Sequence, residues 1–275
     1  MEELGQILMI SDEQLIEWSQ SGKSESEPNA YNRFKEVILA CFDVEDIFLQ
    51  GSYANSTEVY ISSDIDIVVV CKGPEHGSYG WESRLKRLKY QLYNSIESYH
   101  NFRFEMGKKT IKYSGSSKYA PTDILPCISF TNRNGDQGIV FYDHRNHRLV
   151  FNYPKQHKAN GIAKNERTGG EFKRIVRVFK NLRDSLIEDG IIRYNLAPSY
   201  FLECLLYNVP DCCYTSYIPD SFHNVVGWLQ NNKMLLPQMK CQNGIQSLFN
   251  GYSGWDLGNC YIFIDAIANE VRYDA

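Results

Sequence analysis

The chain has 275 residues and a mass of 31.8 kDa, which is enough for one large domain or two smaller ones that share a cleft. Its formal net charge of −4 argues against a protein whose main task is to coat nucleic acid, because that task needs a broadly basic surface. The acidic N-terminal segment has only a short apolar run, and no apolar run is long enough to span a bilayer. We therefore expect a cytoplasmic protein with no membrane partner.

The eight cysteines are scattered and form no Cys-x-x-Cys pair, so free thiols in a reducing compartment are expected. The alternative is a zinc site that uses the adjacent Cys212 and Cys213. No His/Cys pair lies at ligand spacing from these two residues, and this disfavours zinc.

The N-terminal half is expected to be mixed and rich in strands. "SDEQ" at Ser11 is a capping box and predicts a helix, the polar segment 21–29 predicts a loop, and helical spacing resumes over 30–42. A strand over 46–50, a strand over 64–70 and an amphipathic helix over 81–99 follow. Further strands are predicted over 102–106, 110–113, 122–130, 138–143 and 148–152.

Helical patterns dominate from Lys155 onward, over 155–163, 170–188, 198–207, 220–232 and 256–272. The change in pattern predicts a catalytic half over 1–153 and a helical half over 154–275 that completes a shared cleft. The N-terminal helices are expected to pack with the helical half.

Two aspartates begin the apolar run of "SDIDIVVV". Asp64 and Asp66 share one face of the predicted strand, where two dry, ionised carboxylates would repel each other strongly. A Mg²⁺ ion between them removes this cost, because Mg²⁺ takes one or two carboxylates together with substrate phosphates. The alternative is an exposed pair on an edge strand, but the apolar residues that follow favour a buried central strand.

Asp123 in "TDILPC" is the third candidate carboxylate. Three carboxylates on adjacent strands can hold two metal ions about 3.5–4 Å apart. We predict two Mg²⁺ ions, with Mn²⁺ as an alternative: one orients a triphosphate, and the other lowers the pKa of an attacking hydroxyl. Asp123 can also serve as the base that takes the hydroxyl proton.

A turn with small residues precedes the aspartates, where Gln50, Gly51 and Ser52 end a predicted strand. Glycine allows the backbone to approach a ligand closely, and a helix that begins just after it offers its N-terminus to phosphate. Gly-Ser alone is common in turns, and its value here is its spacing from the Asp-x-Asp strand.

The motifs "QGSYANST…SDIDIVVV" and "TDILPC" resemble the nucleotidyltransferases of the DNA polymerase β superfamily. With "NYPKQHKANGIAKN" ahead of a basic helix, the chain is similar to the bacterial CD-NTases, relatives of animal cyclic GMP–AMP synthase and 2′-5′ oligoadenylate synthase. The resemblance covers over half of the chain, residues 50–207. It implies an α+β fold: a polymerase β-like nucleotidyltransferase core with a mixed β-sheet, plus a C-terminal helical subdomain like that of oligoadenylate synthase.

The resemblance also implies nucleotide-binding residues in the helical half. Lys173, Arg177 and Lys180 share a flank of the helix 170–188, which is either a solvated basic face or a cationic wall near the triphosphate. Lys180 matches the lysine that contacts the triphosphate in the family. In "SY", Ser199 would contact the triphosphate and Tyr200 would stack on the base, although core packing is the alternative for the tyrosine.

Asn160 and Asn165 are candidates to read a base edge through their amides. The family implies synthesis of a cyclic di- or trinucleotide from NTPs with release of pyrophosphate, in anti-phage (CBASS) signalling with a regulatory protein and a downstream effector. Activation by DNA is not expected, because the chain lacks a matching Cys/His insertion and is slightly acidic. The alternatives are nucleotide transfer to an aminoglycoside, a protein or a tRNA, and a non-catalytic nucleotide sensor.

Overall fold

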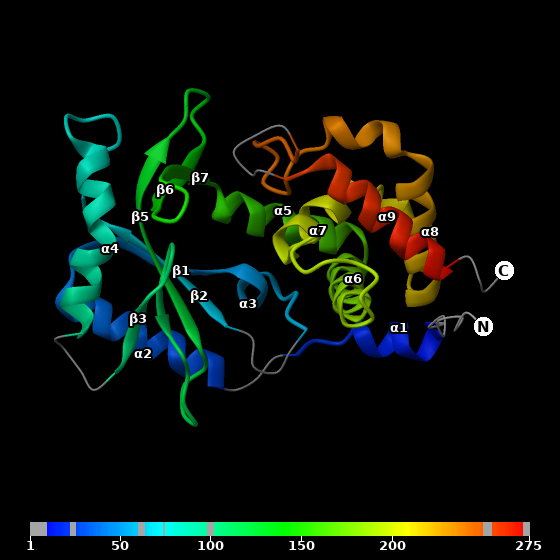
Figure 1. Cartoon of the computed structure of the whole chain (residues 1–275), viewed down its shortest axis with the longest axis horizontal. Helices are drawn as coiled ribbons and strands as arrows, with labels where there is room; N and C mark the ends of the chain where they lie inside the picture. Colours follow the sequence, from blue (N-terminus) through cyan, green and yellow to red (C-terminus); the bar gives the residue numbers. More distant parts are fainter. Residues whose placement is uncertain are drawn as a thin grey trace. The chain divides into compact units, whose positions relative to one another are not determined.

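The computed structural model describes residues 10–22, 26–59, 64–73, 75–97, 102–249 and 255–271. The chain forms two compact units, one of residues 22–158 and the other of residues 1–21 together with 159–275. The first unit is built on a mixed β-sheet and the second is helical (Figure 1).

The sheet unit follows the order α2 (Ser26–Cys41), β1 (Val44–Gln50), α3 (Gly51–Asn55), β2 (Ile65–Cys71), α4 (Trp81–Glu97), β3 (Phe104–Met106), β4 (Ile111–Tyr113), β5 (Thr122–Thr131), β6 (Gln137–Asp143) and β7 (Arg148–Asn152). Within the described ranges the sheet has seven strands, ordered β1-β2-β5-β4-β3, and β6 and β7 continue from the far end of β5. β2 and β5 run parallel, and the other pairs are antiparallel.

β2 is an interior strand between β1 and β5, and its apolar residues are buried on both of its faces. Ile65, Ile67 and Val69 are fully buried on one face. Val68 and Val70 point to the other face, where they pack with apolar residues of β5 and β6. α2 packs against β1 and β2, and α4 packs against β5 and β6.

The helical unit contains α1 (Asp12–Trp18), most of α5 (Pro154–Arg167), α6 (Glu171–Glu188), α7 (Ser199–Tyr207), η1 (Asp211–Cys213), α8 (Ile218–Asn231), η2 (Lys233–Gln238) and α9 (Leu257–Val271). Its core lies around α6, whose apolar stripe of Phe172, Ile175, Val176, Phe179 and Leu182 is fully buried. α1 packs on α6 and α8, and the Ser11 hydroxyl accepts a hydrogen bond from the Gln14 backbone amide at 3.3 Å, as a capping residue does.

The predicted fold class is confirmed, and two expectations need correction. α2 begins at Ser26, inside the predicted loop, because Pro28 lies in its first turn, where a proline removes no helical hydrogen bond. α2 also packs on the sheet rather than with the helical unit, since Phe34, Val37 and Ile38 bury their side chains in the sheet unit.

All eight cysteines are free thiols. None of the helices within the described ranges is long and apolar enough to cross a membrane.

Candidate active site

Strand register brings two of the predicted carboxylates side by side. β2 and β5 are parallel neighbours, and Asp66 lies opposite Asp123 in their register. On the other side of β2, Gln50 at the end of β1 lies opposite Asp66. The first residues of β2 and β5 and the last residue of β1 therefore meet at one edge of the sheet, and Asp64 immediately precedes β2 at this edge.

The pKa of Asp64 is raised above its ordinary value by its surroundings. Partial burial raises the pKa of this carboxyl group, and the negative charge of Asp123 raises it further. The ammonium group of Lys112 acts in the opposite direction and lowers the pKa. Asp64 and Asp123 are thus close enough to repel each other, and a bound cation would relieve this repulsion.

Asp123 has two partners that the sequence analysis missed. Thr110 donates a hydrogen bond from Oγ1 to Asp123 Oδ2 at 3.2 Å, and Lys112 Nζ lies 3.3 Å from the same oxygen. Lys112 stands directly opposite Asp123 in the antiparallel β4–β5 pair. The predicted strand over 110–113 contains both residues, but only the pairing of β4 with β5 shows that they face Asp123.

Gly51 is the first residue of α3 and touches the carboxylate of Asp66. Its φ is +73°, in the left-handed region. A Cβ atom at this position would lie 2.0 Å from Asp66 Oδ2, so any side chain would displace the carboxylate. Glycine is required here both for the backbone conformation and for the close approach of Asp66. Ser52 follows in the first turn of α3, and its carbonyl oxygen accepts a hydrogen bond from the Thr57 amide at 3.0 Å.

The donor chemistry of this edge fits Mg²⁺, because three carboxylates lie at the same ends of adjacent strands. In the described part of the chain, however, no three His, Cys, Asp or Glu side chains are gathered tightly enough to form a ligand group. Asp123 is instead paired with Lys112. Binding of Mg²⁺ by Asp64, Asp66 and Asp123 stays a prediction, and the ammonium group of Lys112 would compete electrostatically with a metal ion at Asp123.

Of the two alternatives for the basic flank of α6, a solvated face is wrong for two of its three members. Arg177 is buried and donates a hydrogen bond from Nε to the carbonyl oxygen of Ser19 at 2.6 Å. Lys180 is 2% exposed, and its ammonium group donates to Glu203 Oε1 of α7 at 2.7 Å. Removing an ammonium group from water is costly, and the Glu203 carboxylate of α7 offsets part of this cost for Lys180 of α6. Contact between Lys180 and a triphosphate stays a prediction.

Ser199 and Tyr200 open α7, as the sequence predicted for this helix. Ser199 is half-buried, and its Oγ accepts a hydrogen bond from Arg183 Nη1 at 3.0 Å. Arg183 is one turn beyond Lys180 and was not singled out from the sequence, because its only local signal is that spacing. Tyr200 packs against Trp255 with a ring-centroid distance of 5.8 Å, and Asn243 Nδ2 donates to its hydroxyl at 3.5 Å.

The two asparagines of α5 proposed to read a base both form hydrogen bonds with other segments of the helical unit. Asn160 donates from Nδ2 to the carbonyl oxygen of Gln242 at 2.8 Å. Asn165 Oδ1 accepts from the backbone amide of Lys173 at 3.0 Å and so caps the first turn of α6. Their contact with a base is untested.

Comparison with known proteins identifies the family. The family model described as the cGAS/DncV-like nucleotidyltransferase C-terminal helical domain matches residues 159–272. The cyclic UMP-AMP synthase of Rhodothermus marinus is 33% identical over 271 residues, which cover 88% of this chain and 91% of that protein. The chain belongs to the bacterial CD-NTases. This confirms the family predicted from the sequence, and this CD-NTase is therefore a nucleotidyltransferase.

Two further comparisons involve Elizabethkingia meningoseptica. This CD-NTase is 32% identical to the cyclic dipurine nucleotide synthase of that organism, over 74% of this chain and 77% of that protein. The solved structure of the E. meningoseptica CdnE cyclic dinucleotide synthase with GTP and Apcpp has a TM-score of 0.84 and 29% identity to this CD-NTase, and the match covers 95% of this chain and 98% of that one. The whole architecture, sheet unit and helical unit alike, is that of the family.

Proposed function

We propose that this CD-NTase joins NTPs into a cyclic di- or trinucleotide in a Mg²⁺-dependent reaction that releases pyrophosphate. The observation that carries the proposal is the placement of Asp66 beside Asp123, with Gly51 against Asp66. The names of the relatives support the same reaction, because both are synthases of cyclic nucleotides.

In the proposed reaction, a ribose hydroxyl oxygen of one nucleotide attacks the α-phosphorus of another. The new P–O bond forms as the bond between the α-phosphorus and the oxygen bridging to the β-phosphate breaks, and pyrophosphate leaves. A last attack of the same kind, within the linear product, closes the ring. Mg²⁺ held by Asp64, Asp66 and Asp123 would neutralise triphosphate charge and lower the pKa of the attacking hydroxyl. Gly51 leaves room for the Asp66 carboxylate, and Thr110 orients Asp123, which we propose as the acceptor of the hydroxyl proton.

The bases of the product do not follow from similarity. The two relatives are similar to this chain to nearly the same degree, 33% and 32% identical, yet one is named for a UMP–AMP product and the other for dipurine products. We propose Gln50, Gly51, Ser52, Lys180, Ser199 and Tyr200 as general nucleotide contacts. Asn160 and Asn165 remain the proposed base contacts.

The direct test is mass spectrometry of the products formed from an equal mixture of the four NTPs with Mg²⁺ or Mn²⁺. A cyclic oligonucleotide is expected from the native protein and none from the double variant Asp64→Asn/Asp66→Asn. The matched control is Glu36→Gln/Glu82→Gln, which removes two exposed carboxylates of the same unit and should retain turnover. A linear product, nucleotide transfer to an aminoglycoside, protein or tRNA, or full activity of the aspartate variant would contradict the proposal.

Metal binding can be tested without turnover. A non-hydrolysable ATP analogue should raise the melting temperature of the native protein more with Mg²⁺ than with EDTA, because a ligand that binds only the folded state stabilises it. The same Mg²⁺-dependent increment should be absent from Asp64→Asn/Asp66→Asn. An increment of equal size in that variant would contradict the assignment of these carboxylates as metal ligands.

We further propose a role in anti-phage (CBASS) signalling, with a regulatory protein and an effector that the product activates. The support is the family relationship. A plaque assay tests this role. Bacteria that carry the native gene with its neighbouring genes should be protected from phage, and bacteria that carry Asp64→Asn/Asp66→Asn should not. Equal protection by the variant would contradict a role for the product.

A further inference from the structure

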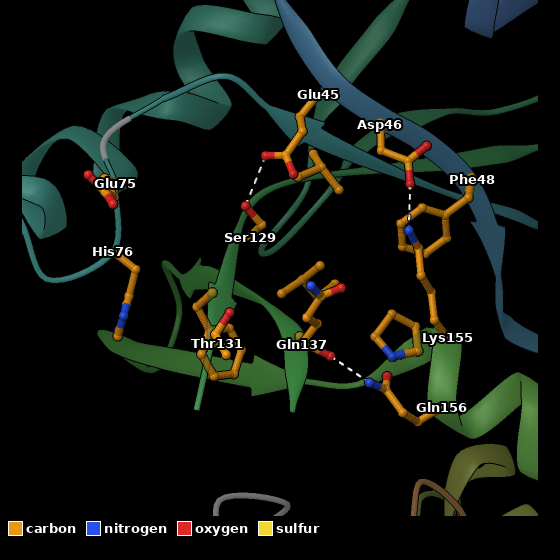
Figure 2. A pocket seen from close by; sticks show the side chains of 15 residues that line it. Glu45, Asp46, Phe48, Glu75, His76, Ser129, Thr131, Gln137, Lys155 and Gln156 are labelled. Carbon is orange, nitrogen blue, oxygen red and sulfur yellow. Dashed lines mark hydrogen bonds and ion pairs between the residues drawn. The ribbon is translucent and has the colours of Figure 1, made fainter. Parts of the chain in front are cut away.

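The sheet unit contains a cavity of about 430 Å³ at the end of the sheet opposite the carboxylates. Its lining residues come from the start of β1, the ends of β2 and β5, the start of β6, the loop before α4 and the first turn of α5 (Figure 2). Ser129 in this lining is six residues along β5 from Asp123, which corresponds to roughly 20 Å of strand. The cavity is therefore separate from the candidate active site, and its volume is in the range of small-molecule sites.

The charge of the lining is negative. Glu45, Asp46 and Glu75 contribute three carboxylates, and Lys155 contributes one ammonium group. Lys155 is committed to Asp46, at 2.7 Å between Nζ and Oδ2, so Glu45 and Glu75 leave an excess of two negative charges. Glu45 accepts a hydrogen bond to Oε2 from Ser129 Oγ at 2.9 Å (Figure 2), and a carboxylate has capacity to accept more.

Gln156 in the lining is held in place by a hydrogen bond to β6. Its Nε2 donates to the carbonyl oxygen of Gln137 at 2.7 Å, and this contact fixes which end of the amide is the nitrogen. The Oε1 atom is buried and accepts no hydrogen bond from any described residue. Because Oε1 is not exposed to the cavity, Gln156 contributes to the lining through the rest of its side chain, which the hydrogen bond from Nε2 holds against β6.

Apolar side chains line the remainder of the cavity. Val70, Phe130 and Ile139 are at least nine-tenths buried and contribute to the lining together with Phe48. His76 packs against Phe130 with a ring-centroid distance of 5.5 Å. The cavity thus offers apolar contact on some sides and hydrogen-bond acceptors on others, and its net charge disfavours an anionic nucleotide.

We propose that this cavity is a second binding site, distinct from the nucleotide site, for a small organic cation that carries a donor-rich amidinium or guanidinium group on an apolar body. The cation is drawn to Glu45 and Glu75, its N–H groups donate to the Glu45 carboxylate, and the apolar body packs on Phe130 and Ile139. Planar cations of this kind have several N–H donors and no acceptor, which matches a lining rich in acceptors.

The probe for this site is benzamidine, titrated into the full chain without NTPs and followed by heteronuclear NMR or calorimetry. Benzamide has the same shape without the charge, and benzoate reverses the charge. Benzamidine should bind saturably in the millimolar range or more tightly, and both controls should bind about tenfold more weakly or not at all, as expected when charge-assisted hydrogen bonds are lost. Equal binding of benzamide, or no saturable binding of benzamidine, would overturn the proposal.

Two variants locate the binding. Glu45→Gln/Glu75→Gln should weaken benzamidine binding about tenfold, whereas the control Glu82→Gln/Glu105→Gln, which removes the same charge elsewhere on this unit, should leave it unchanged. Ser129→Phe places an aromatic ring at an exposed strand position of the lining and should abolish binding. Equal losses in the two glutamate variants would show a nonspecific charge effect and overturn the proposal. If Ser129→Phe does not fold, the comparison of the two glutamate variants still decides.

Discussion

Substitution of Gly51 by alanine tests whether the approach of this glycine to Asp66 matters for the reaction. Two effects are expected. The left-handed backbone conformation, φ +73°, costs an alanine about 1–2 kcal/mol. The new Cβ atom would also lie 2.0 Å from Asp66 Oδ2, whereas ordinary contact begins near 3.4 Å, so the oxygen must move by 3.4 − 2.0 = 1.4 Å.

A displacement of this size at a catalytic group can lower the rate by about a hundredfold. We therefore expect Gly51→Ala to lose about 1–2 kcal/mol of stability, or roughly 2–8 °C in melting temperature, and about a hundredfold in kcat/KM. The matched control is Gly80→Ala, because Gly80 has φ +70° and a Cβ atom added to it would meet no other atom within 4 Å. It should show the same loss of stability with turnover near that of the native protein.

The assays are thermal unfolding and steady-state release of pyrophosphate from NTPs, both measured on the native protein and the two variants. A kcat/KM for Gly51→Ala within a factor of about three of that for Gly80→Ala would refute a role for this close approach. The expected difference is about a hundredfold, and each tenfold change corresponds to about 1.4 kcal/mol of transition-state stabilisation. Unfolding of Gly51→Ala at the assay temperature would contradict the expected stability loss of about 1–2 kcal/mol, and the melting curves reveal that case.

Three further predictions concern charged groups. Lys112→Met should lower the Mg²⁺ concentration needed to stabilise the complex with an ATP analogue, because Lys112 competes with the metal for Asp123. A variant that needs a higher Mg²⁺ concentration would count against this competition. Asp64→Asn should stabilise the metal-free protein in EDTA at neutral pH and have no effect below about pH 3.8, and denaturant unfolding at several pH values checks the sign. The pKa of Asp64 is raised in the folded state, so ionisation of this group favours the unfolded chain as pH rises above the ordinary value, and the cost is absent when both states are protonated. Lys180→Met should cost about 3–5 kcal/mol, because it removes the ammonium group that faces the buried carboxylate of Glu203. Lys180→Met/Glu203→Leu should recover most of that loss in a denaturant titration. A double variant as unstable as the single one would show that the ion pair itself stabilises the fold.

Local signals in the sequence were sufficient for the secondary structure and for part of the site. The Asp-x-Asp pair, the preceding Gly-Ser and the periodicities of the strands and helices all depend on residues within a few positions of one another. α6 and β5 lie close to their predicted bounds, because amphipathic spacing and apolar alternation are themselves local. α2 begins earlier than predicted, because polar residues before a proline resemble a loop until the packing of the helix decides otherwise.

The relations between distant segments were decided by the tertiary structure. Asp66 and Asp123 meet because two strands pair in parallel in one register, and a shift by a single residue would turn Asp123 to the other face of the sheet. Lys112 faces Asp123 and Glu203 faces Lys180 for the same reason: each partner is on another element, and no local spacing records the pairing. A sequence thus shows which residues can carry charge and in which local conformation, but the burial and the partner of each charge depend on packing between elements.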